Sequence, residues 1–314
     1  MHEVPYPEIF KIKTERQERI DGIRLDMHGA VPHVGPISPG CTGCLSPKRG
    51  SGIFFGRECP CSCSFCYYEL GRPEETEEEQ LARVREYVEM FREYPPENVS
   101  FTSEGETLLH LDKMNMVAQE LNRLERQHGI SIHRHVYTNG VYADRETLEF
   151  LAEMGVDEIR FHLSATDFHP LIIEHMRDAK KIGFKVTVEE PAWPPLRSKL
   201  FELLPTFHDI GLSHLNLIEM ELTSDNFNRT EKLYPQGIYY RDFLYHLYDE
   251  GLVYDIMEEV IKNNYCFSVL DCGSIIERYR GNHYMYNFFD YSLLDNITLP
   301  FEPNQPNQHW YTPR

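Results

Sequence analysis

The chain has 314 residues, and 31 lysines and arginines against 50 aspartates and glutamates give it a formal net charge of −19. This length suits one large domain or two small ones, with a core that needs no disulfides for folding. The acidic balance argues against nucleic acid as the main partner, because phosphate binding needs clustered basic side chains. Since the sequence shows no apolar run of membrane-spanning length and no secretory signal, we expect a cytoplasmic protein that does not contact a membrane.

The first motif along the chain is a cluster of cysteines. Six of the eight cysteines lie close together in sequence: Cys41, Cys44, Cys59, Cys61, Cys63 and Cys66. In a chain without a secretory signal, such clustering indicates metal binding rather than a set of disulfides.

Two kinds of metal site are consistent with this spacing. A zinc ribbon would pair two CxxC knuckles and take its ligands from Cys41, Cys44, Cys63 and Cys66. An iron–sulfur cluster would instead use the three thiolates of the Cys59-x3-Cys63-x2-Cys66 run. Because a tetranuclear cluster has four irons to ligate, three cysteines would leave one iron open to another ligand.

Downstream of the cysteines, strand-like and helix-like segments alternate with a near-constant period. The predicted strands occupy residues 52–56, 98–103, 131–137, 157–163, 184–189 and 213–219, and a seventh strand-like segment covers 265–270. Two helices are predicted from their start signals, a capping box at Thr76 and an N-cap at Asp144. Four further helices are predicted over residues 110–128, 168–182, 196–211 and 241–264. This order predicts a parallel sheet with crossover helices, either as an open doubly wound sheet or as an incomplete barrel.

The cysteine loop resembles the CxxxCxxC signature of the radical SAM superfamily, in the segment Cys59-Pro60-Cys61-Ser62-Cys63-Ser64-Phe65-Cys66-Tyr67. The likeness includes an aromatic residue, Phe65, before the last cysteine. It implies an α/β fold, a partial (β/α)6 TIM-like barrel with N- and C-terminal extensions, and a [4Fe-4S] cluster held by Cys59, Cys63 and Cys66. An upstream CxxC also makes the layout similar to proteins related to activating enzymes of glycyl-radical proteins.

From this resemblance we expect three parts along the chain. Residues 1–49 would form an N-terminal extension that carries the CxxC knuckle, and residues 50–264 the barrel. Residues 265–314 would form a C-terminal extension that caps the barrel.

The resemblance also implies an activity. The family cleaves S-adenosylmethionine reductively at the cluster, under anaerobic conditions, and the resulting 5′-deoxyadenosyl radical abstracts hydrogen from a substrate. An electron donor such as ferredoxin or flavodoxin would reduce the cluster. The substrate is left open as a small molecule or a peptide or protein, in peptide modification or cofactor biosynthesis. No side chain is assigned as catalytic, and Cys61 is either a spectator or a hydrogen donor.

In such a barrel the cofactor site lies at the carboxyl ends of the strands. The turn after the second strand keeps the last two residues of the family's Gly-Gly-Glu motif, with Glu104 in place of the first glycine. A glycine lets the backbone approach a ligand, and a carboxylate pairs with an ammonium group. The residues expected to contact S-adenosylmethionine are Phe65, Gly105, Glu106, Asn139, Ser164 and Glu190.

Four cysteines outside the cluster loop suggest a second metal centre. In an incomplete barrel both extensions border the open side, so the Cys41 and Cys44 pair could meet Cys266 and Cys272 there. The second centre would be an auxiliary iron–sulfur cluster, a mononuclear iron or a zinc. The alternative is four separate thiols packed as small apolar groups.

Overall fold

The main feature of the fold is a nine-stranded sheet, seen in a computed structural model that describes residues 1–26, 31–45, 50–66, 68, 75–241 and 245–273. The strand order is β2-β3-β13-β9-β8-β7-β6-β5-β4, and β4 through β9 together with β13 run parallel. These seven strands are β4 (Gly50–Phe54), β5 (Asn98–Thr102), β6 (His133–Thr138), β7 (Glu158–Phe161), β8 (Lys185–Pro191), β9 (His214–Ile218) and β13 (Ser268–Cys272). All seven were predicted from the sequence.

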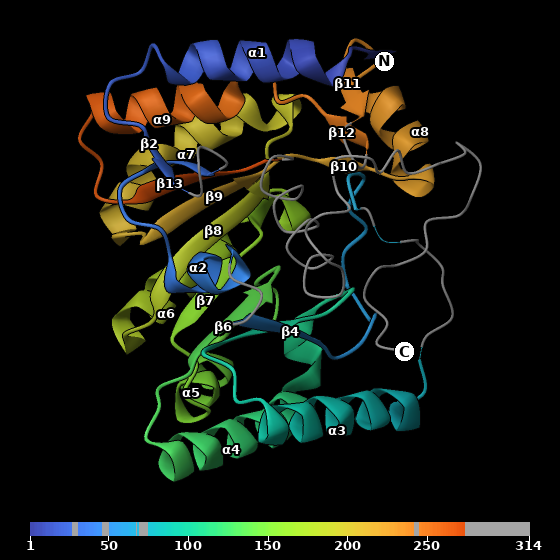
Figure 1. Ribbon diagram of the computed structural model, residues 1–314, viewed down its shortest axis with the longest axis vertical. Helices are drawn as coiled ribbons and strands as arrows, with labels where there is room; N and C mark the ends of the chain where they lie inside the picture. The colour runs from blue at the N-terminus through green and yellow to red at the C-terminus, as the bar shows by residue number, and fades with distance from the viewer. Residues whose placement is uncertain (27–30, 46–49, 67, 69–74, 242–244, 274–314) are drawn as a thin grey trace, which may run out of the picture.

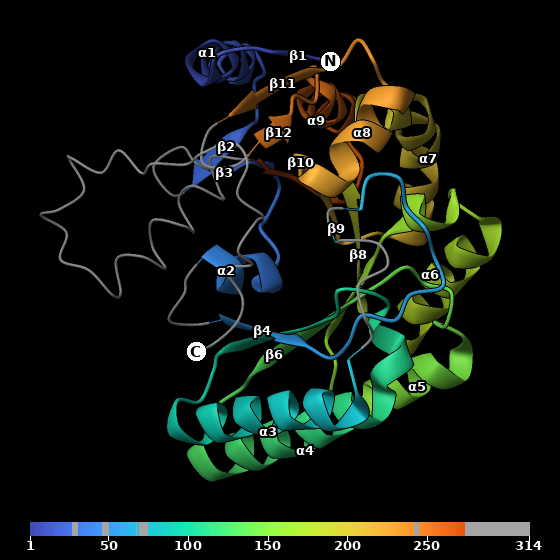
Figure 2. The same cartoon turned by 90° about the vertical axis from the view of Figure 1, so that its right-hand side faces the viewer.

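Helices cover the outer face of this curved sheet (Figure 1). They are α3 (Glu77–Glu93), α4 (Leu111–His128), α5 (Arg145–Glu153), α6 (Pro170–Ile182), α7 (Arg197–Ile210) and α9 (Leu252–Lys262). The apolar core lies between these helices and the sheet, and includes Phe101, Leu121, Ile159, Met176 and Leu215. Figure 2 shows the sheet as an open C with the helices outside it, which confirms the partial TIM-like barrel and excludes the doubly wound alternative.

The helix starts follow the signals in the sequence. The Thr76 hydroxyl accepts from the Glu79 backbone N–H while the Glu79 carboxylate accepts from the Thr76 backbone, so the predicted capping box is present. The Asp144 side chain accepts from the Thr147 backbone N–H at 2.9 Å and starts α5.

The single helix predicted over residues 241–264 is wrong. Its first part belongs instead to a second, four-stranded sheet with the order β1-β11-β12-β10, where β1 is His2–Glu3, β10 is Glu221–Leu222, β11 is Ile238–Arg241 and β12 is Tyr245–Leu247. The helix α9 begins only after Gly251, which has a positive φ of 76° that favours glycine. The Asp249 carboxylate accepts from the backbone N–H groups of Gly251 and Val253 and fixes this start.

The N-terminal part of the chain extends the main sheet beyond β13. β2 (Arg24–Asp26) and β3 (Val31–Val34) form a hairpin, and β3 pairs antiparallel with β13. The helix α1 (Tyr6–Gln17) lies against the second sheet, and α2 (Pro39–Leu45) lies in the opening of the C (Figure 2). The two extensions therefore meet, as expected, and the sheet continues past both expected boundaries of the barrel.

The remainder of the C-terminal extension, residues 274–314, lies outside the described residues, so its expected place over the barrel stays a prediction. In the part of the chain that is described, no helix is both long and apolar enough to cross a membrane.

Candidate functional site

The cysteine loop lies at the carboxyl end of β4, where the sequence placed it. Its last turn is closed by the Cys66 backbone N–H, which donates to the Cys63 carbonyl at 3.2 Å. Cys61, Cys63 and Cys66 are half-buried and Cys59 is exposed. The thiols are therefore held at the edge of the barrel, partly shielded from water.

The electrostatics of the loop suit a bound cationic centre. Burial, together with the nearby Cys66, Cys61 and Cys59, raises the pKa of Cys63 to about 12. Burial likewise raises the pKa of Cys61 to about 11, with Cys59 as a further cause. These thiols are near enough that their anions would repel one another, and ligation to iron removes that cost.

Among the described residues, no three His, Cys, Asp or Glu side chains are grouped to hold a single metal ion. The number, chemistry and mutual influence of the loop thiols fit an iron–sulfur cluster, which takes thiolate ligands. The cysteine triad Cys59, Cys63 and Cys66 stays a prediction.

Asn139, at the end of β6, lies beside two of the thiols. Its side-chain amide lies 3.4 Å from the Cys61 sulfur and 3.9 Å from the Cys59 sulfur. Its backbone N–H donates to the Glu106 carboxylate at 2.7 Å. The turn after β6 thus faces the cysteine loop, and the expected contact of Asn139 with a cofactor stays a prediction.

Glu106 is buried, and its carboxylate is engaged by the chain itself. It accepts from the Thr138 hydroxyl at 2.7 Å and from the Leu108 backbone N–H at 2.9 Å, in addition to Asn139. Burial raises the pKa of this carboxyl. In this structure Glu106 connects the ends of β5 and β6, and its expected contact with an ammonium group stays a prediction.

Gly105 is required by close backbone packing. A methyl group added there would lie inside van der Waals contact with the carbonyl oxygens of Arg57 and Glu58, the two residues before the cysteine loop. Beside it, the Arg57 guanidinium donates to the Glu104 carboxylate at 2.8 Å. Glu104, which replaces the first glycine of the Gly-Gly-Glu motif, therefore has its side chain paired with Arg57.

Ser164 and Glu190, expected as separate cofactor contacts, bind each other. The Glu190 carboxylate accepts from the Ser164 hydroxyl and from the backbone N–H groups of Leu163 and Ser164. Burial raises the pKa of Glu190 to about 8. This pair connects the ends of β7 and β8, while Glu189 takes the barrel-facing position on β8.

Phe65 packs among aromatic side chains at the mouth of the barrel. Its ring centroid lies 5.4 Å from that of His162 and 5.9 Å from that of Trp193. Burial lowers the pKa of His162 to about 4, so this imidazole is neutral at pH 7. Trp193 was not singled out in the sequence, because an aromatic residue after a strand is usually part of the core.

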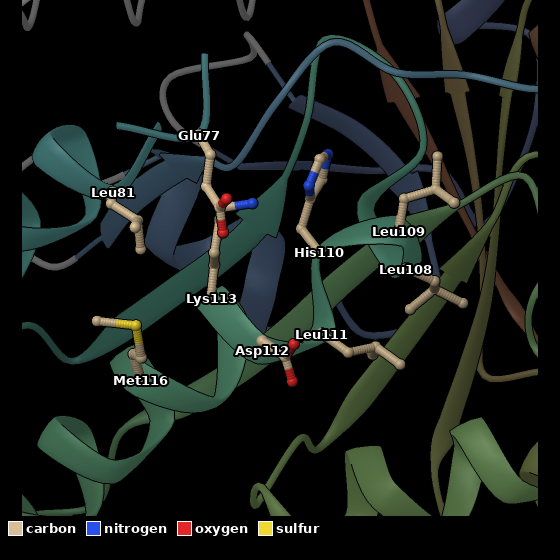
Figure 3. Close-up of a pocket in the computed structure, with 9 residues that line it drawn as sticks. All are labelled: Glu77, Leu81, Leu108, Leu109, His110, Leu111, Asp112, Lys113 and Met116. Carbon is tan, nitrogen blue, oxygen red and sulfur yellow. The ribbon is translucent and has the colours of Figure 1, made fainter. Parts of the chain in front are cut away.

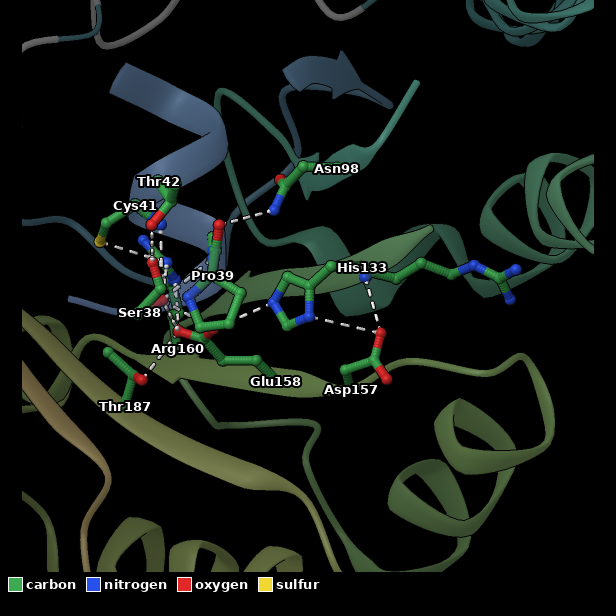
Figure 4. A network of polar contacts seen from close by, with 12 residues as sticks. Ser38, Pro39, Cys41, Thr42, Asn98, His133, Asp157, Glu158, Arg160 and Thr187 are labelled. Atoms are coloured by element: carbon green, nitrogen blue, oxygen red, sulfur yellow. Dashed lines mark hydrogen bonds and ion pairs between the residues drawn. The ribbon is translucent and has the colours of Figure 1, made fainter. Parts of the chain in front are cut away.

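Below the strand ends, the barrel interior holds a buried polar network (Figure 4). The Arg160 guanidinium forms ion pairs with Glu158 at 2.9 Å and with Glu189 at 3.0 Å, and donates to the Cys41 sulfur at 3.4 Å. The Asn216 amide donates to the same sulfur at 3.3 Å. The helix α2 thus reaches the inner wall of the barrel through Cys41.

The structure separates two of the four cysteines that were expected to share a second metal centre. Cys272 ends β13, whereas Cys266 precedes this strand and is exposed beside His208 at the opposite edge of the sheet. Five residues of strand span about 16 Å, too far for two ligands of one metal. Cys41 is already engaged by Arg160, and the Cys44 side chain lies outside the described residues. The Cys41 sulfur accepts from Arg160 and Asn216 in the barrel interior, which gives no support to a zinc ribbon.

A pocket of about 480 Å³ lies outside the barrel, between the starts of α3 and α4 (Figure 3). It is lined by Leu81, Leu109, His110 and Met116, among others, and by none of the expected site residues. One of its lining residues, His110, has its ring 3.2 Å from the carboxylate of Glu58, which precedes the cysteine loop. We therefore place the functional site at the strand ends.

Two further residues contact the cysteine loop and were missed in the sequence. Asn226 and Arg229, on α8 (Ser224–Leu233), donate to backbone carbonyls of the loop. They lie about 160 residues downstream of the loop. Because they bind backbone carbonyls, which every residue has, the sequence of the loop gives no sign of these contacts.

Comparison with known proteins agrees with this geometry. Residues 53–190 match the family model described as the radical SAM superfamily. A Methanocaldococcus jannaschii protein named as a glycyl-radical enzyme activating enzyme, MJ0021, is 25% identical over 208 residues, which are 62% of this chain and 53% of the relative. The chain thus spans about half the length of this curated relative.

Among solved structures, SuiB of Streptococcus suis is similar, with a TM-score of 0.51 and 12% identity over 84% of this chain and 59% of SuiB. SuiB bound to S-adenosylmethionine gives a TM-score of 0.50 and 14% identity, over 70% and 49% of the two chains. SuiB bound to its precursor peptide SuiA gives 0.50 and 12%, over 91% and 64%. At such identities the likeness shows the fold alone. The match over residues 53–190, together with the CxxxCxxC loop, supports the assignment of this part of the chain to the radical SAM superfamily.

Proposed function

We propose that this chain is a radical SAM enzyme that binds a [4Fe-4S] cluster through Cys59, Cys63 and Cys66 and acts on a peptide or protein. The observation that carries the proposal is the placement of the cysteine loop at the carboxyl edge of a parallel half barrel, where the Asn139 amide lies 3.4 Å from the Cys61 sulfur and 3.9 Å from the Cys59 sulfur. When bound, the cluster supplies the electron that cleaves S-adenosylmethionine into methionine and the radical that removes hydrogen from the substrate. Ferredoxin or flavodoxin would donate that electron.

The chain's own residues bind, orient and exclude water. The Asn139 amide is placed to donate toward the sulfurs and any ligand beside them, and Glu106 fixes its backbone. Phe65, His162 and Trp193 form an aromatic wall beside the loop, which limits the access of water to a reactive radical. Neutral His162 adds no charge that would have to be solvated there.

Reconstitution under anaerobic conditions tests the cluster. We expect uptake of iron and sulfide, followed by release of 5′-deoxyadenosine that depends on a reductant. Cys63→Ala should abolish this release, whereas Cys266→Ala should not, because Cys266 is exposed at the opposite edge of the sheet. Retention of zinc with no cleavage in the wild-type protein would refute the proposal, and a loss of iron in Cys266→Ala would reinstate the second centre.

The substrate class rests on two likenesses. MJ0021 is named for action on another enzyme, and SuiB has been seen with a precursor peptide. Deuterated cell extract, separated into small molecules, peptides and proteins, can test the class, because hydrogen removed from the substrate ends in 5′-deoxyadenosine. We expect deuterium in this product only with the peptide or protein fractions. Transfer from the small-molecule fraction alone would contradict the proposed class.

A further inference from the structure

The cysteine loop accepts hydrogen bonds from a helix that lies outside the segment matched by the family model. On α8, Arg229 donates through Nε to the Ser64 carbonyl at 3.1 Å and through Nη2 to the Cys66 carbonyl at 3.0 Å. Asn226, one turn earlier on the same face, donates to the Phe65 carbonyl at 3.2 Å. Three consecutive carbonyls of the loop thus accept from two side chains of one helix.

Asn226 is itself fixed in place. It is fully buried, and its amide also donates to the Glu221 carbonyl at 2.9 Å. Its side-chain oxygen accepts from the Thr223 backbone N–H at 2.9 Å, which completes the capping box that starts α8. A side chain with all its hydrogen-bonding groups engaged has little freedom to move, so it holds the Phe65 carbonyl at a set position.

The ring of Phe65 is held from the other side. It packs against an apolar cluster that contains Trp193, Leu222 and Leu247, and Phe227 of α8 packs against the same cluster. The loop backbone and its aromatic side chain are therefore both anchored to the second sheet and α8. All of these contacts are made by groups of the chain itself.

The guanidinium of Arg229 also brings a positive charge next to a thiol of the loop. Its Nη2 donates to the Cys66 carbonyl at 3.0 Å, so the charge lies next to a residue expected to bind the cluster. A fixed positive charge and hydrogen bonds near a cluster favour its reduced, more negative state.

We propose that Asn226 and Arg229 are positioning residues: they hold the carbonyls of Ser64, Phe65 and Cys66 before a cluster is bound, and Arg229 raises the reduction potential of the bound cluster. The second part rests on the proposed function. The first part concerns the metal-free chain and stands independently of it.

Hydrogen exchange of the metal-free, full-length protein, followed by mass spectrometry, tests the first part. In Arg229→Met, which keeps an unbranched apolar side chain but removes the guanidinium donors, the peptide covering residues 59–66 should exchange about tenfold faster than in wild type. The control is Lys232→Met, which removes an exposed charge from the same helix and should leave that peptide unchanged. Equal exchange in wild type and Arg229→Met would overturn the proposal.

Two conservative variants keep the test informative if Arg229→Met folds poorly. Asn226→Asp retains the acceptor of the capping box but loses both amide donors, so loop exchange should rise while α8 stays protected. Arg229→Lys keeps the charge and one donor, and its loop exchange should lie between wild type and Arg229→Met. Loop exchange unchanged in both variants would also overturn the proposal.

A potentiometric titration of the reconstituted proteins, followed by electron paramagnetic resonance, tests the second part. The reduction potential should fall in Arg229→Met and return toward the wild-type value in Arg229→Lys. A purely structural role would predict the same potential in all three proteins, and that result would refute the electrostatic part. If wild type binds no cluster, the proposed function fails, while the exchange experiment still decides on the loop.

Discussion

The guanidinium of Arg160 and the sulfur of Cys41 lie 3.4 Å apart, although 119 residues separate them in the chain. Arg160 is buried at the centre of the network in the barrel interior, where it also neutralises Glu158 and Glu189. One side chain thus connects the N-terminal extension with two strands of the barrel.

Removing this guanidinium should be costly. Arg160→Met leaves two buried carboxylates without their counterion, and we expect a loss of about 3–5 kcal/mol in the free energy of unfolding. Urea unfolding measures the loss. The control is Arg145→Met, which breaks an exposed ion pair with Glu149 and should cost at most about 0.5 kcal/mol. A similar small loss in both variants would show that the interior network adds no stability.

Gly105→Ala should displace the start of the cysteine loop. The added methyl group meets backbone carbonyls of Arg57 and Glu58, which cannot rotate away as a side chain could. We expect a loss of about 1–3 kcal/mol and a lower yield of reconstituted cluster. Gly52→Ala is the matched control, since the nearest atom to its new methyl group is 3.9 Å away on Phe54. If Gly105→Ala is as stable as Gly52→Ala, the backbone of Arg57 and Glu58 does not approach Gly105 this closely.

Glu106→Gln separates a structural role from a ligand contact. The amide nitrogen of glutamine would face N–H or O–H donors that now bind the carboxylate, so we expect a loss of about 1–3 kcal/mol without any ligand present. Thermal unfolding of the ligand-free protein gives the answer. Unchanged stability together with weaker binding of S-adenosylmethionine would instead assign Glu106 to the ligand.

Stability should fall in acid partly because of His162. The pKa of this buried imidazole is about 4 in the folded protein, below its usual value of 6.5, so folding favours the neutral form. The free energy of unfolding is therefore unaffected by this group above pH 6.5. As the pH falls from 6.5 toward 4, the free energy of unfolding decreases by up to about 3 kcal/mol. Glu189 opposes the shift and Ser164 and Phe65 face the ring.

The comparison with His162→Gln isolates this effect, because glutamine does not titrate. The difference in unfolding free energy between wild type and variant should shrink or reverse from pH 7 to pH 4.5 in urea titrations. A constant difference across this range would mean that the pKa of His162 is the same in the folded and the unfolded protein.

The parallel sheet could be predicted because its signals are local. Strands such as β7 are short alternating segments, and helices such as α3 and α5 begin at side chains that bind their own first turn. The cysteine spacing is local as well. These features depend on neighbours within a few residues, so a sequence records them directly.

The second sheet could not be predicted because its pairing is remote. β11 pairs with β1, about 235 residues earlier, and with β12, so aromatic residues such as Tyr240 take strand positions in a stretch that also suits a helix. The candidate site shows the same limit. Ser164 and Glu190 were singled out individually, but their binding to each other depends on how β7 and β8 end in space.

The pairing of β3 with β13 has a consequence for the synthesis of the protein. Val34 of β3 lies in register with Val269, so the hairpin at residues 24–34 has no partner until almost all of the described chain has left the ribosome. Contacts of such separation form slowly, and chains emerge N-terminus first. The cysteine loop likewise precedes α8 by some 160 residues. During translation the thiols of the nascent chain are therefore exposed before the helix that orders them has been synthesised. Iron that binds at that stage would bind a loop that α8 does not yet hold in place.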